Sequence, residues 1–287
     1  MQIQHFYDAR TSTLTYVVFD AEDRVGIVID SVLDFDPASG RTWTESADAV
    51  GAFLDDRGLR VPYVLDTHAH ADHITAIPYF KARYGARSVI GARISMVQQV
   101  FREIFNLGDS LPTDGRPFDV LLADGEKLDV GPFEIEALHS PGHTPACMAY
   151  RIGDALFVGD TLFQPDYGTA RCDFPGGSAD ELYTSISRLY RTLPPETRAF
   201  TCHDYRPGGR PMQFESTLGE QAAHNVQLSS GTHREAFIAF RKERDAGLGM
   251  PTLILPSIQL NLHAGEFPAP EANGVSYLKL PLNLFDR

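Results

Sequence analysis

Short runs of β-branched and aromatic residues alternate with amphipathic stretches along the first part of the chain. Such runs predict β-strands, because these side chains fit a pleated and half-buried surface. The predicted strands are residues 15–19, 26–30, 61–65, 88–90, 133–139 and 155–158. Helical stretches lie between them, and the pattern partly repeats after the middle of the chain, which favours sheets covered by helices.

Apolar residues recur at helical spacing between these strands. Thr44 is the predicted N-cap of a helix over residues 44–57, and Gly85 closes the next helix. Residues 106–118 and the Pro- and Asn-rich stretch from Met250 are predicted to be mostly loop. The remaining predicted helices are residues 74–84, 94–105, 181–193 and, as a polar outer segment, 217–245.

The composition describes a chain that can bury a core. Of the 287 residues, 43% are hydrophobic, which is enough for one large α/β (α+β) domain. The formal net charge of −13 makes nucleic-acid phosphates and anionic lipids unexpected partners, so neither nucleic acid nor membrane binding is predicted. The N-terminal stretch MQIQHFYDAR lacks the order of a secretory signal, and three cysteines are too few for a disulfide scaffold. We therefore expect a cytoplasmic location.

One short segment carries the strongest chemical signal. Three histidines and one aspartate lie within six residues, directly after the strand predicted at residues 61–65. Neutral imidazole is the commonest metal ligand in proteins, and a carboxylate accompanies it well. In extended backbone, His68 and His70 point the same way, while Asp72 and His73 can turn toward a second position if a helix begins there. The segment predicts one or two metal positions.

Three further candidate ligands follow predicted strand ends, where sheets present functional loops. His143 lies in Ser-Pro-Gly-His-Thr, Asp160 in Val-Gly-Asp-Thr, and His203 in Thr-Cys-His-Asp-Tyr. Any one of them alone is more often an ordinary loop residue. Their joint occurrence in this order is the informative observation.

The order HxHxDH, Gly-His, Gly-Asp and His resembles the metallo-β-lactamase superfamily over nearly the whole chain. The fold that this resemblance implies is a four-layer αββα sandwich with the metal site at one edge of the two sheets. Residues 1–287 are therefore expected to form a single metallo-β-lactamase-like domain, with a C-terminal extension from about residue 250.

Three stretches resemble the persulfide dioxygenase (sulfur dioxygenase) branch of this superfamily, which is close to glyoxalase II. They are Thr-His-Ala-His-Ala-Asp-His-Ile-Thr from Thr67, residues 168–174 with Arg171, and His-Asp-Tyr ending at Tyr205. By this resemblance, Arg171 and Tyr205 line the site for the glutathione moiety. A guanidinium suits that role because it binds a carboxylate through two parallel hydrogen bonds.

The same resemblance implies a cofactor and a reaction. The cofactor is one Fe(II) per chain, held by His68, His143 and Asp160. Two imidazoles and one carboxylate leave three positions open, as in non-haem iron oxygenases. The implied small-molecule substrate is glutathione persulfide, which O₂ oxidises to sulfite and glutathione. The residues expected around the iron, or at a second metal position, are His70, Asp72, His73 and His203.

Two alternatives stay open. A thioesterase of the glyoxalase II type uses the same seven side chains to hold two zinc ions, or a mixed zinc and iron pair, with Asp160 as the bridge. A metal-binding sensor or interaction module without catalysis is the alternative from a different class. A homodimer is one possible assembly, because dimers are the commonest oligomers.

The sequence also departs from the branch that it resembles. Cys202 stands where relatives often have Gly, and Thr169-Ala170 where many have Cys-Gly. Cys172 and Cys202 adjoin Arg171 and His203, and a cationic neighbour can activate a thiol. Space-filling cysteines near the site are the simpler interpretation.

Overall fold

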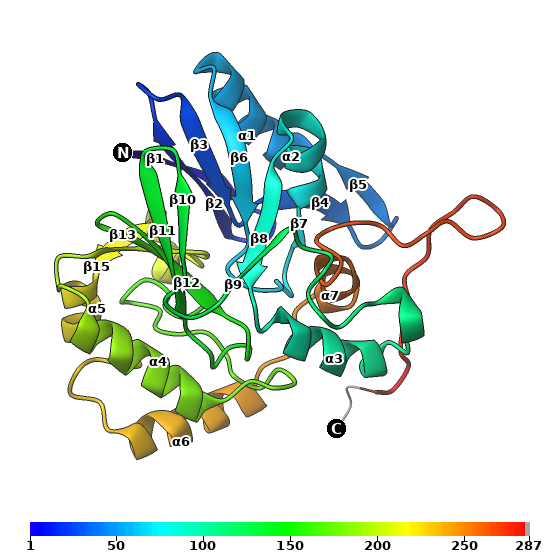
Figure 1. Ribbon diagram of the computed structural model, residues 1–287. Helices are drawn as coiled ribbons and strands as arrows, with labels where there is room; N and C mark the ends of the chain where they lie inside the picture. The colour runs from blue at the N-terminus through cyan, green and yellow to red at the C-terminus, as the bar shows by residue number, and fades with distance from the viewer. Residues whose placement is uncertain (285–287) are drawn as a thin grey trace.

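The computed structural model describes residues 1–284 and places two six-stranded sheets face to face (Figure 1). Among the first three strands of the first sheet, neighbours are antiparallel to one another, and each later strand runs parallel to its neighbour, starting from the third. Its strands, in spatial order, are β1 (Gln2–Asp8), β2 (Thr13–Asp20), β3 (Val25–Ile29), β6 (Arg60–Leu65), β8 (Arg87–Gly91) and β9 (Val120–Leu122).

The second sheet is antiparallel except for one parallel pair, β13 and β14. Its strands lie in sequence order, from β10 to β15. They are β10 (Lys127–Val130), β11 (Phe133–His139), β12 (Met148–Ile152), β13 (Ala155–Gly159), β14 (Arg198–Thr201) and β15 (Glu215–Thr217). A third, small sheet has the order β5 (Arg41–Trp43), β4 (Val32–Asp36) and β7 (Ile74–Thr75).

Helices cover the outer face of each large sheet (Figure 1). The first sheet carries α1 (Glu45–Asp56), α2 (Ile77–Tyr84), α3 (Ile94–Ile104) and α7 (Ile254–Asn261). The second carries α4 (Ala179–Thr192), α5 (Leu218–His224) and α6 (Arg234–Ala246). Short 3₁₀ turns form at Gly108–Ser110 and Pro207–Gly209. The arrangement confirms the expected four-layer αββα sandwich.

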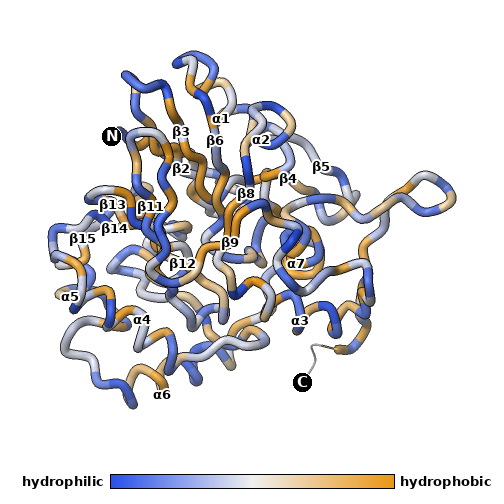
Figure 2. The backbone as a smooth tube through the Cα atoms, in the orientation of Figure 1, coloured by the Kyte–Doolittle hydropathy of each residue, from blue (hydrophilic) through white to orange (hydrophobic). Residues whose placement is uncertain are grey.

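Three apolar cores hold the four layers together. The central core joins the two sheets and includes Tyr16, Ile27, Ile135 and Phe157. The other two cores lie between each sheet and its helices. Figure 2 shows the hydrophobic residues concentrated on the strands, with hydrophilic residues on loops and outer helix faces. Burial of this apolar area is the main stabilising contribution to the fold.

Local sequence explains where several elements begin and end. Gly85 adopts a left-handed conformation at the end of α2, as expected. Ser178 caps α4 by accepting a hydrogen bond from the backbone N–H of Glu181. Thr44 lies at the N-cap of α1 but does not cap through its side chain, which donates to Asp48 instead.

Two of the predicted elements were wrong. Ile74 and Thr75 form strand β7 rather than the start of a helix, so Asp72 and His73 precede a strand. The segment 217–245 is not one helix, because α5 and α6 are separate helices joined by a loop. The stretch from Met250 to residue 284 is mostly loop, as predicted, but the largely buried helix α7 forms within it. Within residues 1–284, no helix has the length and apolar character needed to span a bilayer.

Candidate metal centre

The candidate ligands lie on loops at one edge of the two sheets. His68 and His70 follow β6, Asp160 follows β13, and His203 follows β14. His143 lies in the loop between β11 and β12. Gly159 has a φ of +52°, and a Cβ there would lie 2.5 Å from Thr67 Oγ1, so a glycine lets β13 approach the histidine segment closely.

Three of these side chains form a compact group. Ligand atoms of His68, His143 and Asp160 all lie within 4.8 Å of one another, and all three residues are buried. Asp160 Oδ2 is 3.9 Å from His68 Nε2 and 3.7 Å from His143 Nε2. One ion placed among them would meet two imidazoles and one carboxylate, the set typical of a three-ligand iron site.

A second set of donors lies beside the first. His203 Nε2 is 3.4 Å from Asp160 Oδ1 and 3.3 Å from Asp72 Oδ2. Asp72 Oδ2 is also 3.2 Å from His73 Nδ1. Ligand atoms of His70, Asp72 and His73 lie within 4.8 Å of one another. The structure therefore brings all seven predicted ligand residues together.

Unpaired buried atoms show that the residues present fit a metal ion. Five polar atoms of this cluster are buried and have no hydrogen-bond partner within residues 1–284. Leaving such an atom unpaired costs about 1–3 kcal/mol. Cations bound among these groups of donors would supply the missing partners. The atoms are His68 Nε2, His70 Nδ1, His73 Nε2, Asp160 Oδ1 and His203 Nε2.

The opposite ring nitrogens are held by hydrogen bonds, which orient the imidazoles. His143 Nδ1–H donates to the carbonyl of Arg171 at 2.8 Å, and His203 Nδ1–H donates to the carbonyl of Ser12 at 3.2 Å. His70 Nε2–H donates to Asp30 Oδ1 at 3.0 Å. These partners fix which nitrogen of each ring is free for a metal. The sequence analysis missed Asp30 and Ser12, which no motif marks.

Burial and neighbouring charges keep His68 and His70 neutral. Burial, together with neighbouring imidazoles, lowers the pKa of His68 and of His70 well below the ordinary value. A neutral ring retains the lone pair that binds a metal, so both side chains are ready to act as ligands without losing a proton at neutral pH.

The pKa values of the two carboxylates, Asp160 and Asp72, shift in opposite directions. Burial raises the pKa of Asp160 above its ordinary value. Burial also acts to raise the pKa of Asp72, but His203 and His73 outweigh it and hold that pKa well below the usual range. Burial lowers the pKa of His203, while Asp72 and Asp160 raise it, and the net shift is upward. In the absence of metal, the second set therefore stabilises itself by pairing imidazole with carboxylate.

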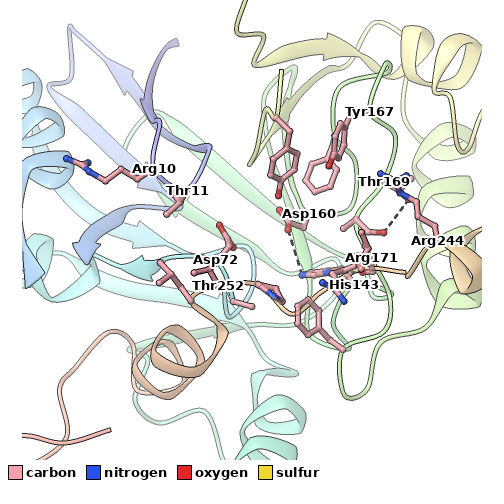
Figure 3. A pocket seen from close by; sticks show the side chains of 18 of the residues that line it. Arg10, Thr11, Asp72, His143, Asp160, Tyr167, Thr169, Arg171, Arg244 and Thr252 are labelled. Atoms are coloured by element: carbon pink, nitrogen blue, oxygen red, sulfur yellow. Dashed lines mark hydrogen bonds and ion pairs between the residues drawn. The ribbon is translucent and has the colours of Figure 1, made fainter. Parts of the chain in front are cut away.

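A cavity of about 520 Å³ opens beside the cluster (Figure 3). Asp72, His143 and Asp160 line it, so the candidate ligands are accessible from the cavity. Its walls also carry five aromatic side chains and four arginines. A small molecule with an anionic and an apolar part suits such a lining. The lining aromatic residues are Phe35, Phe163, Tyr167, Phe174 and Tyr205, and the arginines are Arg10, Arg171, Arg241 and Arg244.

The two predicted substrate-binding residues, Tyr205 and Arg171, differ in whether their side chains are free to contact a ligand. Tyr205 is 41% exposed and stacks on His203, with ring centroids 5.6 Å apart. The guanidinium of Arg171 is already engaged, because Nε and Nη2 each lie 2.6 Å from a carboxylate oxygen of Asp173. Arg171 Nη1 donates to the carbonyl of Gly249 at 2.7 Å. Arg171 thus ties the cavity wall to the C-terminal segment.

All three cysteines are buried and free. Burial raises the pKa of the Cys147 and Cys172 thiols to about 12 and the pKa of Cys202 well above its ordinary value. A raised pKa makes the thiolate rare at neutral pH and the sulfur unreactive. The space-filling interpretation therefore fits these thiols better than activation by a cationic neighbour.

The family can now be stated. The family described as the metallo-beta-lactamase superfamily matches residues 10–203, so the chain belongs to this superfamily. The chain is 49% identical over 293 residues to a probable metallo-hydrolase of Burkholderia pseudomallei, which covers 99% of both chains. It is 48% identical to a beta-lactamase hydrolase-like protein of Xylella fastidiosa and spans 65% of that protein's length.

Two kinds of named enzyme lie among its relatives. The chain is 42% identical over 284 residues to glyoxylase B2 of Dictyostelium discoideum, covering 98% of this chain and 97% of the relative. It is 31% identical over 230 residues to the mitochondrial persulfide dioxygenase ETHE1 of Bos taurus, covering 79% and 76%. The crystal structure of ETHE1 from Myxococcus xanthus matches 93% of this chain and all of its own, with a TM-score of 0.75 and 29% identity.

Proposed function

We propose that this protein is an Fe(II)-dependent persulfide dioxygenase that oxidises glutathione persulfide. The observation that carries the proposal is the three-residue group of His68, His143 and Asp160, whose ligand atoms lie within 4.8 Å of one another. Similarity to the persulfide dioxygenase ETHE1 supports it. The balanced reaction takes glutathione persulfide, O₂ and water to glutathione, sulfite and two protons, with the terminal sulfur oxidised and O₂ reduced.

Bound iron would supply the redox chemistry with O₂, and the protein would hold and orient the reactants. The Arg171 carbonyl fixes the ring of His143 through Nδ1, which leaves Nε2 for the metal. The aromatic side of the cavity, including Tyr205, limits access of water to the reacting sulfur. Arg244 offers a guanidinium to an anionic group of the substrate.

Pairing within the second set favours one metal over two. Asp72 Oδ2 lies 3.2 Å from His73 Nδ1, so this carboxylate can hold the ring of His73 in place without a second ion. These residues then surround the iron and move or store protons, in the manner of groups that support a metal site.

A two-metal thioesterase is the second candidate function. His203 Nε2, which lies 3.4 Å from Asp160 Oδ1, and the unpaired His73 Nε2 favour it, because they can complete a second metal position. Similarity to glyoxylase B2 also supports it. In that case the bridging carboxylate would be Asp160, and the substrate a glutathione thioester.

Metal content and oxygen uptake separate the two candidates. The protein is purified without oxygen, its iron and zinc are quantified, and O₂ consumption is followed with glutathione persulfide. About one iron per chain with sulfite formation is the expected result. About two zinc ions per chain, no O₂ uptake and hydrolysis of glutathione thioesters would establish the thioesterase instead.

Removing a ligand tests the three-residue assignment. His143→Ala should abolish iron retention, because it deletes one of three protein ligands. His263→Ala is the control, since His263 hydrogen-bonds the carbonyls of Gln259 and Ser110 and is not among the clustered ligands. A His143→Ala protein that keeps its iron and its full activity would disprove the assignment.

A further inference from the structure

Asn261, the last residue of α7, makes an unusual set of contacts with the histidine segment. Its side chain is 1% exposed. The Nδ2 group donates to the backbone carbonyls of His70 and His73, both at 2.8 Å. The Oδ1 atom accepts from the backbone N–H of Thr75 at 2.9 Å. Every hydrogen of the amide group is used, and all three partners are backbone groups of one six-residue stretch.

These three bonds enclose the part of the segment that carries Asp72. Ordinary secondary structure does not hold this stretch, since strand β7 begins only at Ile74. On one side β7 pairs with β4 through Thr75 and Val32. On the other side the Asn261 amide replaces the missing backbone partners, so buried carbonyls that would otherwise be unpaired are satisfied.

The turn after α7 packs against the same stretch. A Cβ at Gly265 would lie 2.7 Å from Pro78 Cδ and 2.8 Å from the carbonyl of Thr75, so the backbone passes directly over it. Gln98 of α3 donates to the carbonyl of Leu262 at 3.0 Å and holds this turn in place. The contact is therefore a rigid docking of the C-terminal segment on the metal loop, and the family match at residues 10–203 does not include it.

We propose that Asn261 is a positioning residue that sets the affinity of the metal centre by fixing the backbone of His70, Asp72 and His73. The proposal rests on the metal centre of the proposed function, in which His70, Asp72 and His73 form the second set of donors beside the iron ligands, but not on its reaction. Asn261 touches no candidate ligand atom and acts only through the backbone. Partners that orient metal ligands typically change metal affinity 10- to 100-fold when they are removed.

Zinc affinity of the metal-free, full-length protein tests the proposal, measured by competition with a chromophoric chelator. Asn261→Asp keeps the acceptor for Thr75 but sets a carboxylate against two carbonyl oxygens, and Asn261→Ala removes all three bonds. We expect both variants to bind zinc at least about tenfold more weakly than the wild type.

Gln259 provides the matched control. It is a buried amide on the same helix, and it hydrogen-bonds the backbone of Leu255 and Lys279 rather than the metal loop. Gln259→Ala should lower the melting temperature while changing zinc affinity less than about twofold. Wild-type zinc affinity in folded Asn261→Asp and Asn261→Ala proteins would overturn the proposal, as would an equal loss in Gln259→Ala.

If the variants do not fold, hydrogen exchange on the wild-type protein tests the proposal instead. Coupling between two sites is reciprocal, so zinc binding should stabilise the docking of α7. We expect zinc to slow amide exchange at Thr75 and in α7 more than in α1, which lies on the same sheet away from the ligands. Equal effects on α1 and α7 would overturn the proposal. None of these measurements requires turnover, so a failed dioxygenase assay leaves their meaning intact.

Discussion

Arg244 differs from the other three arginines of the cavity because its guanidinium is unengaged. Arg10 pairs with three carboxylates, Arg171 with Asp173, and Arg241 with Asp245. Within residues 1–284, Arg244 has no ion pair and no side-chain hydrogen bond. A substrate carboxylate is the natural partner for such a group at the wall of a cavity. Arg244 is therefore a second candidate for this role, and the role of Arg171 in substrate binding stays a prediction.

Arg244→Ala should raise KM for glutathione persulfide about tenfold and leave kcat within about twofold. A hydrogen bond to a charged group contributes about 1.5–3 kcal/mol, and uniform binding of substrate and transition state appears in KM alone. Steady-state kinetics of O₂ uptake measure both constants. Arg234→Ala is the control, because Arg234 lies on the same helix but pairs with Asp180. An unchanged KM in Arg244→Ala would remove this residue from the substrate site.

Single residues differ in how far the sequence can predict them. The ligand candidates were predictable because their residue types, close spacing and position after strands are local features. Asp30, Asn261 and Arg244 were not predictable, because their importance depends on contacts across the fold. Asn261, for example, lies 188 residues from His73 in sequence. An isolated amide or arginine has no pattern around it that separates this role from an ordinary surface position.

At the scale of elements, the loop that carries His143 depends on close contact with helix α4. Gly142 has a φ of +142°, and a Cβ there would lie 2.4 Å from backbone atoms of Leu182. The Gly142 carbonyl accepts from the backbone N–H of Ser178 at 2.8 Å, and Ser185 Oγ donates to the carbonyl of Pro141 at 2.7 Å. The helix therefore sets the position of the loop.

Gly142→Ala should lower the free energy of unfolding by at least about 2 kcal/mol, because overpacking and an unfavourable backbone conformation add. Chemical denaturation of the metal-free protein measures this change. Gly231→Ala serves as the control, since nothing lies within 4 Å of a Cβ at that position. Its effect should stay within about 0.5 kcal/mol. Equal stability of the two variants would show that the loop can move away from α4.

Elements with a clear periodic pattern were predictable, and those decided by distant pairing were not. The predicted strand at residues 133–139 matches β11. Helix α7 was missed because Pro256 and the nearby prolines indicate loop, yet Pro256 lies in the first turn, where a helix tolerates proline. Strand β7 was missed because two residues carry no period, and their pairing with β4 is non-local.

At the scale of the whole molecule, the order of the ligand motifs predicted the four-layer sandwich correctly. Each motif follows a strand, and the sandwich brings all of the motifs to one edge of the two sheets. The order of strands within each sheet could not be read from local patterns, because β3 pairs with β6 across an intervening helix and two other strands. The pairing of strands that are distant in sequence is decided by tertiary packing.

Buried cysteine thiols and tyrosine hydroxyls make the stability of the whole molecule fall at high pH. Burial raises the pKa of Cys147 and Cys172 to about 12 and the pKa of Tyr16 and Tyr150 well above the ordinary value. In the unfolded chain these groups lose protons at lower pH, so the unfolded state binds fewer protons than the folded state. Their contribution to stability is complete below about pH 9 and is lost as pH rises toward the folded pKa values.

The free energy of unfolding of the metal-free protein should therefore fall steadily between about pH 9 and pH 12, by up to about 1.4 kcal/mol per pH unit for each group. Denaturation curves at several pH values, with tyrosinate absorbance as a second signal, measure this slope. Cys172→Ala removes one such group, so its slope should be shallower by about one proton. A flat profile in the wild type, or an unchanged slope in Cys172→Ala, would mean that these side chains ionise without unfolding, and that the sheets admit water near the thiols more readily than their burial indicates.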